Sequence, residues 1–296
     1  MEAVNKFIFF MMSVGIVNIT YAQQQPNFLF YQQNMSVVNP AYSGSEGSLM
    51  SINYSSSWVG VNDAPKSATL VYNSREKNNA SWGFSYLSDK VYVESQGIIS
   101  VDFSYRLQLS ENTNLHLGLK GGSLYNSLSL DGINRITNES NYVLSSVQNF
   151  INPLFGIGAY ARGEKAFVGF SVPNVLNSKR YKDVNGLALT ATDRPHFYLS
   201  GGLKIKLNDQ IGFEPNFLYR IVSGAPNLVT AFANINFNDK VKVGTGVSNN
   251  NYIAGLLLFE GLERLHIGYG YEMGQRTFKF ALRANSHELM IRYKLD

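Results

Sequence analysis

Four histidines, His116, His196, His266 and His287, are the side chains of this sequence best suited to proton transfer or metal binding. They fall in four different stretches that we expect to be strands. None is separated from another histidine or a carboxylate by the spacing of metal ligands, such as H-x-x-x-H or H-E-x-x-H. The sequence therefore predicts structural roles for the histidines and no metal site.

Glycine pairs are the next candidates, because glycine-rich turns bind phosphates or precede catalytic serines in many enzymes. The sequence contains no G-x-S-x-G, no P-loop and no G-x-G-x-x-G. Its G-x-G pairs at 156/158, 244/246 and 268/270 lie in expected strands, where a spacing of two puts both glycines on one face. We expect these pairs to leave space for bulky neighbours.

Covalent and redox chemistry is further limited by the absence of cysteine, since 0 Cys excludes disulfides, thiolate metal sites and Cys nucleophiles. A hydrolase that draws serine, histidine and acid from separate strands stays an alternative, because a motif search does not detect it. We expect no enzymatic activity and no cofactor.

Charge gives little support for a nucleic-acid partner. Lys and Arg total 25 and Asp and Glu 21, a formal net charge of +4, and no basic cluster alternates with aromatic residues. We therefore expect no nucleic acid among the partners.

The N-terminus has the layout of a secretory signal peptide. Lys6 precedes an apolar run over 7–17, and Ala22 ends a stretch suited to cleavage. The run is shorter than the roughly 20 apolar residues that a membrane-spanning helix needs, and no later stretch reaches that length. We expect residues 1–22 to be a signal peptide that delivers the chain to the periplasm.

The mature sequence alternates between apolar and polar residues with a period of two, which is the pattern of half-buried strands. From 196 to 207 the odd positions are apolar or glycine, whereas the even positions include Ser200, Lys204 and Lys206. The apolar face is predicted to carry Phe197, Leu199, Leu203, Ile205, Phe213, Phe217, Tyr219, Val241, Val243, Leu265, Ile267, Tyr269, Leu289 and Ile291.

This pattern predicts an all-β fold of about fourteen antiparallel strands, with almost nothing left that is typical of a long helix. The expected strands are 48–56, 66–73, 80–88, 96–109, 113–123, 153–162, 165–172, 196–207, 210–222, 227–237, 240–248, 251–259, 263–272 and 287–295.

The links between these strands favour a transmembrane barrel over a soluble sandwich. Those after even-numbered strands are tight, and those after odd-numbered strands are mostly longer, the largest being 124–152 and 173–195. Short turns on one rim and long loops on the other are typical of outer-membrane barrels, whose short rim faces the periplasm. We expect a single barrel over 48–296, and a segment over 23–47 that is either periplasmic or a plug.

A barrel in lipid turns its apolar face outward, so the charged face lines the lumen. A structural salt-bridge lattice is the expected role of these charges, and a solute-selective pore is the alternative. The residues predicted to point inward are Asp102, Arg106, Lys120, Lys204, Lys206, Glu214, Arg220, Lys240, Lys242, Glu288 and Arg292.

Several short motifs resemble the PorP/SprF family, and they span almost the whole mature chain. They are Asn39-Pro40-Ala41-Tyr42-Ser43-Gly44, Trp58-Val59-Gly60, Ala64-Pro65-Lys66, Gly169-Phe170-Ser171-Val172-Pro173-Asn174, Arg194-Pro195-His196, Pro215-Asn216-Phe217-Leu218-Tyr219-Arg220, Gly268-Tyr269-Gly270-Tyr271 and His287-Glu288-Leu289-Met290-Ile291-Arg292-Tyr293.

The resemblance implies an outer-membrane protein of type IX secretion that acts in export or surface retention of a large secreted protein, such as a gliding adhesin. It implies as partners the C-terminal region of that secreted substrate, other components of the secretion system and outer-membrane lipid. A porin-like solute channel is the alternative function.

The family motifs and loops supply the candidate partner contacts. For the Asn39 motif, a proline-containing turn leading into the first strand competes with a plug or partner contact. For Trp58 and Pro65, a position in the interfacial aromatic belt competes with partner recognition. The full candidate set is Asn39, Pro40, Tyr42, Trp58, Gly60, Pro65, Pro173 and Asn174.

Overall fold

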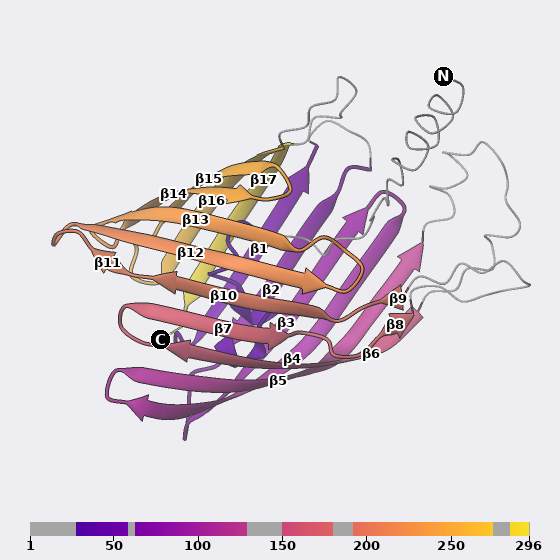
Figure 1. Cartoon of the computed structure of the whole chain (residues 1–296), viewed down its shortest axis with the longest axis horizontal. Helices are drawn as coiled ribbons and strands as arrows, with labels where there is room; N and C mark the ends of the chain where they lie inside the picture. The colour runs from indigo at the N-terminus through magenta and orange to yellow at the C-terminus, as the bar shows by residue number, and fades with distance from the viewer. Residues whose placement is uncertain (1–27, 59–62, 129–149, 180–191, 275–284, 296) are drawn as a thin grey trace, which may run out of the picture.

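The computed structural model describes residues 28–58, 63–128, 150–179, 192–274 and 285–295, so the predicted signal peptide lies outside the described residues. Within these ranges the chain forms a closed antiparallel barrel (Figure 1). Its strands are β1 (Leu49–Ser57), β2 (Lys66–Asn73), β3 (Ala80–Val91), β4 (Glu94–Ser110), β5 (Thr113–Leu128), β6 (Phe150–Arg162), β7 (Ala166–Val172), β10 (His196–Leu203), β12 (Ile211–Val222), β13 (Leu228–Phe237), β14 (Val241–Ser248), β15 (Tyr252–Phe259), β16 (Leu265–Gly274) and β17 (Asn285–Lys294).

Each of these strands pairs with a neighbour on both sides, which closes the sheet. β1 pairs with both β2 and β17, and β10 pairs with both β7 and β12. β11 (Ile205–Lys206) continues the path of β10 along β12, and β8 (Ser178–Lys179) with β9 (Thr192–Asp193) forms a separate two-stranded sheet. The predicted all-β barrel of fourteen strands is therefore confirmed.

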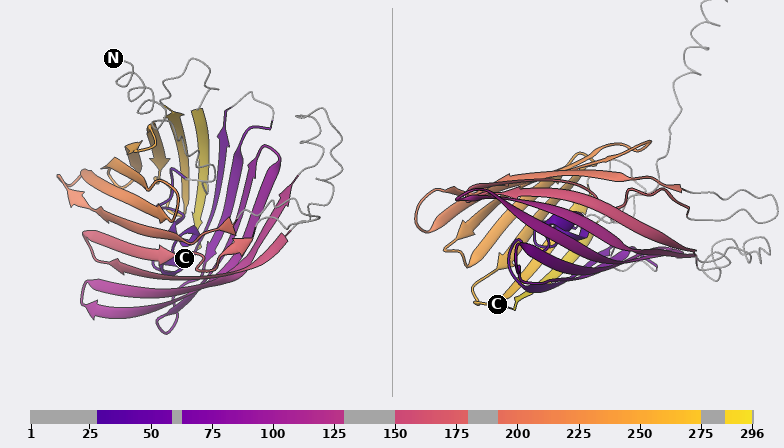
Figure 2. Two further views of the ribbon diagram at one scale, coloured as in Figure 1. Left: turned by 45° about the vertical axis from the view of Figure 1, so that its right-hand side comes forward. Right: turned by 90° about the horizontal axis from the view of Figure 1, so that it is seen from below.

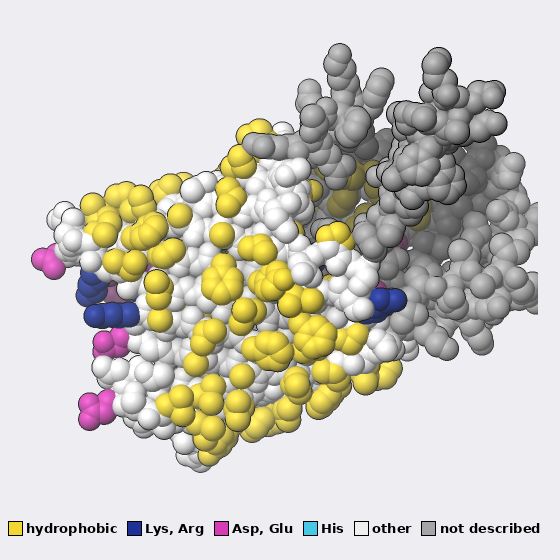
Figure 3. Space-filling model, in the orientation of Figure 1, with side chains coloured by type: hydrophobic (Ala, Val, Ile, Leu, Met, Phe, Trp, Pro, Cys, Tyr) yellow, Lys and Arg dark blue, Asp and Glu magenta, His cyan; other side chains and the backbone are white. Residues whose placement is uncertain are grey.

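The outer face of the barrel is apolar, as the alternation predicted. Leu203 is 49% exposed and Leu289 54%, and no member of the predicted outward set is buried. Figure 3 shows hydrophobic side chains spread over the wall, with the charged side chains of that face at its two ends. Strands meet the need for internal hydrogen bonds in lipid only when the sheet closes, so this face fits a bilayer.

Tight turns join strands at one rim because the sequence supplies residues that accept positive φ. In the β13–β14 link, Asn238 and Asp239 have φ of 51° and 53°, and the N–H of Lys240 donates to the carbonyl of Phe237 at 3.0 Å. Positive φ at both central residues is the geometry of a two-residue type I′ hairpin, for which Asn and Asp are suited.

The opposite rim corrects one sequence prediction. The link after β3 was expected to be among the longer ones, but β3 and β4 stay paired up to Val91 and Glu94, which leaves a two-residue turn. Asp89, Lys90 and Glu94 interrupt the apolar alternation there, yet the ladder continues because its hydrogen bonds join backbone groups, which every residue except proline supplies. β5 and β6 are also longer than expected, so most of the predicted loop 124–152 falls on residues 129–149, outside the described residues.

The core of the protein lies in the lumen. Residues 28–47, which we call the plug, run inside the barrel before entering β1, and they contain two 3-10 turns, η1 (Met35–Val37) and η2 (Pro40–Tyr42). In Figure 2 the indigo plug is seen within the ring of strands. The buried apolar cluster combines plug and wall residues: Leu29, Phe30, Tyr31, Met35, Ala41, Tyr42, Tyr160, Tyr198, Leu218, Phe232, Ala254, Leu256, Leu258 and Met290.

Candidate functional site: the plugged lumen

The centre of the plug is a turn built from the Asn39 motif. The Asn39 side-chain oxygen accepts the N–H of Ala41 at 3.0 Å, and proline at the first position of η2 has no N–H that would need a partner. The Asn39 amide also donates to the wall carbonyl of Ala159 at 3.1 Å. The motif is thus a proline-containing turn, and it is buried inside the lumen.

Polar wall residues fix the plug through its backbone. Glu288 on β17 accepts the N–H groups of Leu29 and Phe30 at 2.7 and 3.1 Å. Ser104 donates to the carbonyl of Ala41 at 3.0 Å, and Ser171 donates to that of Val38 at 2.7 Å. Because the plug has little regular structure, these wall side chains satisfy backbone groups that would otherwise be buried without partners.

A buried ion pair on the wall also holds the plug. The Lys120 ammonium lies 2.8 Å from the Asp102 carboxylate on the neighbouring strand, and the two side chains are 2% and 0% exposed. Lys120 also donates to the plug carbonyl of Ser36 at 3.0 Å. This ion pair is one of the structural salt bridges expected for the lumen charges, and in addition Lys120 binds the plug.

Glycines on the inner wall make room for the plug. A Cβ at Gly118 would overlap the backbone of Ala41, and one at Gly268 would lie 2.7 Å from the Phe30 ring. A Cβ at Gly158 would overlap the side chain of Asn39. The expectation that strand glycines leave space for bulky neighbours is confirmed, and at these positions the neighbour is the plug.

The end of the plug is held at the short-turn rim by two arginines. Glu46 accepts hydrogen bonds from Arg292 on β17 and, at 3.2 Å, from Arg162 on β6. Burial opposes ionisation of Glu46, but the positive charges of Arg292 and Arg162 outweigh it and hold the pKa of Glu46 below its usual value. The carboxylate therefore stays charged and links two strands on different sides of the barrel.

In the described part of the chain, the plug lies between two cavities of the lumen. The inner cavity, toward the short-turn rim, has a volume of about 500 Å³ and is lined by charged residues that include Glu46, Arg162, Lys242 and Glu260. Lys242 lies 2.7 Å from Glu214 and 3.9 Å from Glu260, so part of this charge is paired internally. The outer cavity, on the other side of the plug, has a volume of about 80 Å³.

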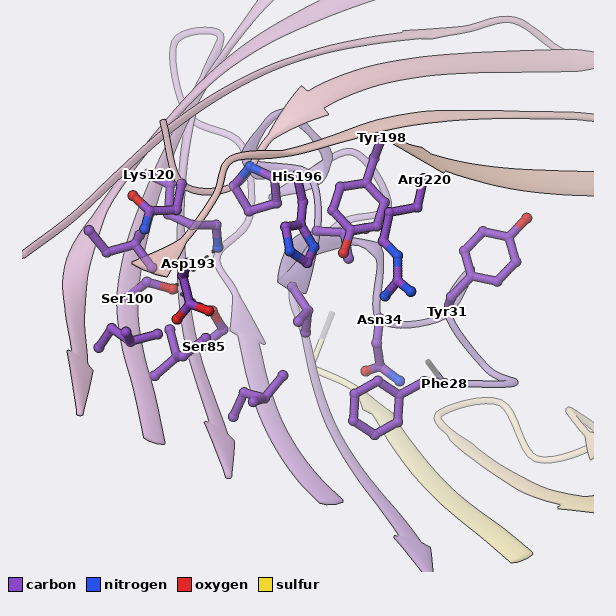
Figure 4. A pocket seen from close by; sticks show the side chains of 18 of the residues that line it. Phe28, Tyr31, Asn34, Ser85, Ser100, Lys120, Asp193, His196, Tyr198 and Arg220 are labelled. Atoms are coloured by element: carbon purple, nitrogen blue, oxygen red, sulfur yellow. Dashed lines mark hydrogen bonds between the residues drawn. The ribbon is translucent and has the colours of Figure 1, made fainter. Parts of the chain in front are cut away.

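The outer cavity combines an apolar lining with a group of polar side chains. Figure 4 shows Tyr198 and Arg220 side by side, with the Arg220 guanidinium directed toward Asn34 of the plug. Its walls come from β3, β4, β5, β6, β10, β12 and β13, and its floor comes from the plug. A cavity with this composition can bind a group that is partly apolar and partly charged.

The predicted partner-contact residues lie in separate places. Asn39, Pro40 and Tyr42 are buried in the plug, with Tyr42 packed edge to face on Tyr160 at 5.3 Å between ring centroids. Sequence reasoning placed these three among possible partner contacts, and the structure surrounds them with the barrel's own wall.

The other predicted residues lie toward the long-loop rim. Trp58 directly follows β1, with φ of 52°, and its ring packs on Tyr92 at 5.6 Å between centroids. The Pro65 carbonyl accepts the N–H of Ser57 at 2.9 Å. Gly60 lies outside the described residues. Pro173 and Asn174 line the outer cavity and are the predicted residues that belong to it.

Most of the lining of the outer cavity was not predicted. Leu87, Ile98 and Leu218 point inward although alternation assigned apolar residues to the lipid face. The signal for them was present where two apolar residues are adjacent on a strand, as in Ile98-Ile99 and Phe217-Leu218, because neighbours on a strand cannot both face lipid.

Within the described ranges, no group of three or more His, Cys, Asp or Glu residues is arranged to hold a metal ion. His116 packs near Tyr160 and His266 lies 3.3 Å from Glu260, in different parts of the lumen. In the same described part of the chain, no helix has the length and apolar character needed to span a membrane.

Comparison with known proteins gives similar folds at low sequence identity. The toluene transporter TbuX of Ralstonia pickettii is 12% identical with a TM-score of 0.48, over 86% of this chain and 91% of that one. The outer membrane protein Omp33 of Acinetobacter baumannii is 10% identical with a TM-score of 0.47, over 84% of this chain and 98% of that one. No curated protein matches the sequence.

The comparison with protein families is more specific. The family described as type IX secretion system membrane protein PorP/SprF matches residues 20–293, which include the plug and all of the barrel strands except the last residue of β17. The apolar wall, the closed sheet and this match together make the protein an outer-membrane barrel. The chain belongs to the PorP/SprF family of type IX secretion system membrane proteins.

Proposed function

We propose that this barrel is a non-enzymatic component of type IX secretion that binds the C-terminal region of a large secreted protein and acts in its export or surface retention. Family membership supports a place in the secretion system, with other components of that system as neighbours. The plug is the structural observation that carries the proposal, because it occupies the lumen and makes the barrel unsuited to free passage of solutes.

A porin-like solute channel is the second candidate. The solved structures similar in fold include the KdgM porin, at 9% identity and a TM-score of 0.43, and a likeness of that size carries no functional argument. The inner cavity of about 500 Å³ is the observation that favours a channel, since it is an open space inside the barrel that is lined by charged residues. A channel would also need a path past Phe30 and Met35, which are each 1% exposed.

The deciding experiment compares the surface proteome of cells with and without this chain. We expect one large surface protein to be depleted while other type IX substrates still reach the medium. Re-expression of the intact chain should restore it, and this complementation controls for effects on neighbouring genes. An unchanged surface proteome, together with steady ion conductance of the purified barrel in a planar bilayer, would replace the secretion role with the channel.

A further inference from the structure

The outer cavity is closed at its base. Phe28, Tyr31, Asn34, Val37 and Val38 of the plug form its floor, and strands surround it on several sides. A group that enters from the long-loop rim therefore cannot continue through the lumen. This geometry is that of a binding recess, since a transport path needs an exit.

The wall of this recess is unusually apolar for a barrel lumen. Much of the remaining inner face carries polar residues such as Ser51, Asn53 and Thr69, and its apolar side chains, such as Leu258 and Met290, pack with the plug in the buried core. At the level of the recess, however, aliphatic side chains point inward from six strands: Leu87, Ile98, Leu124, Leu154, Leu218 and Leu228. Apolar surface of this kind gains free energy when an apolar group replaces water, at about 25 cal/mol per Å².

The recess also carries charged side chains, and cations outnumber carboxylates among those that line it. Three cationic residues line it: Arg194, Arg220 and Lys120. Two carboxylates accompany them, because Asp193 also lines the recess and Asp102 forms an ion pair with Lys120. Among the described residues, these three cations and two carboxylates leave the recess with one net positive charge. Arg194 donates to the carbonyl of Ser223 at 2.9 Å, which holds its guanidinium at the edge of the strands.

The size of the recess limits what it can hold. About 80 Å³ is well below the roughly 300–1,000 Å³ typical of sites for whole small-molecule ligands. It fits one large side chain, and protein–protein contacts commonly gain most of their affinity from single anchors seated in such pockets. A carboxylate next to that anchor would meet Arg220, because guanidinium and carboxylate form strong charge-assisted hydrogen bonds.

We propose that the outer cavity is an anchor site for a partner polypeptide, receiving one large apolar side chain that has an acidic neighbour. This inference rests on the proposed function and narrows it, because it states which chemistry of the secreted protein is recognised and where. The aliphatic wall binds the apolar side chain, and Arg220 with Arg194 attracts the acidic residue beside it.

The experiment uses the full-length barrel in lipid nanodiscs and a defined peptide, acetyl-Asp-(4-fluoro-Phe)-Asp-amide, observed by ¹⁹F NMR. Line broadening should report binding, and the Asn-flanked peptide of the same shape should bind about fivefold more weakly because it lacks the carboxylates. Equal binding of the two peptides would overturn the role of the arginines. Equal binding of free 4-fluorophenylacetate would overturn the choice of a polypeptide.

Two adjacent residues supply a matched pair of variants. Leu228→Phe places extra volume in the cavity, whereas Val229→Phe adds the same ring on the lipid face, where Val229 is 39% exposed. Heat-modifiable gel mobility checks that both variants fold. We expect Leu228→Phe to abolish the broadening and Val229→Phe to keep it. Binding that survives in Leu228→Phe would overturn the proposal, whereas the peptide comparison in the unaltered chain stays decisive if this variant does not fold.

The same variants separate the anchor site from the proposed function. In cells, Leu228→Phe should deplete the surface protein that is lost on deletion of the chain, and Val229→Phe should not. If Leu228→Phe keeps that protein at the surface, the anchor site is overturned while the secretion role stands. If deletion of the whole chain leaves the surface proteome unchanged, the secretion role itself fails.

Discussion

The backbone N–H of Leu29 donates a 2.7 Å hydrogen bond to the carboxylate of Glu288, joining residues 259 positions apart in the sequence. Glu288 is 1% exposed, and it also accepts the N–H of Phe30 and the side-chain amide of Asn53. A single side chain of the last strand thus fixes the start of the plug and a neighbouring strand together.

Removing this acceptor should destabilise the protein. In Glu288→Ala the N–H groups of Leu29 and Phe30 lose their acceptor, which should lower the free energy of unfolding by about 2–3 kcal/mol. Denaturant titration of the refolded barrel measures the change. The exposed Glu263→Ala serves as the control. Equal midpoints for the two variants would contradict the assigned contact.

Two glycines on β5 test the packing of the plug against the wall. Gly118→Ala forces a Cβ into the backbone of Ala41, whereas Gly121→Ala meets no atom within 4 Å. Overpacking of a tight site costs about 1–3 kcal/mol, so Gly118→Ala should be the less stable variant by that amount. Similar thermal midpoints of the two variants in detergent would show that the plug is not closely packed against β5 at Gly118.

Because one face of β10 contacts lipid and the other the lumen, substitutions on the two faces should lower the stability of the protein by different amounts. Leu199→Arg places a charge on the outer face in the middle of β10, where Leu199 pairs with Phe170 and Tyr219, and should lower stability by about 2–4 kcal/mol. Ser200→Ala, on the lumen face beside Met35, should cost much less because it removes only two long contacts, at 3.9 Å to the Met35 sulfur and 3.5 Å to the Gly169 carbonyl. Folding titrations into lipid vesicles compare the two, and equal costs would reverse the assigned faces.

The ion pairs of Glu46 with Arg292 and Arg162 predict how the stability of the protein changes with pH. Because its pKa is lower in the folded protein, its contribution to stability is complete above the unfolded value of about 4.5 and declines as the pH falls below it. Thermal unfolding of the native chain and Glu46→Gln should therefore differ at pH 7 and converge in acid. A stability difference between the two proteins that grows toward low pH would contradict the role of these ion pairs.

Removal of the plug should open the lumen. A chain lacking residues 28–44 keeps Glu46, which contacts Arg292 and Arg162, but loses Phe30, Met35 and Tyr42 from the lumen. We expect the intact barrel to show no steady current in a planar bilayer and the shortened barrel to conduct. If the shortened barrel folds but carries no current, the plug is not what blocks ion flow through the lumen.

The sequence by itself determined the wall of this protein. Strand alternation depends on neighbouring residues, so it identified fourteen strands, their lipid faces and most tight turns from local pattern alone. The same reasoning placed Asp102 and Lys120 in the lumen and gave the inner glycines a packing role. It also carried the family resemblance, which the comparison with protein families confirmed.

The tertiary structure alone decided the contents of the lumen. The contacts of the plug join residues far apart in the chain, as Leu29 with Glu288 does, and local pattern contains no information about such pairs. For the same reason Pro173 and Asn174 could be named from the sequence, but not their place in one cavity with Leu218 and Arg220. A cavity exists only once a closed sheet brings its strands and the plug together, so its shape and charge follow from closure.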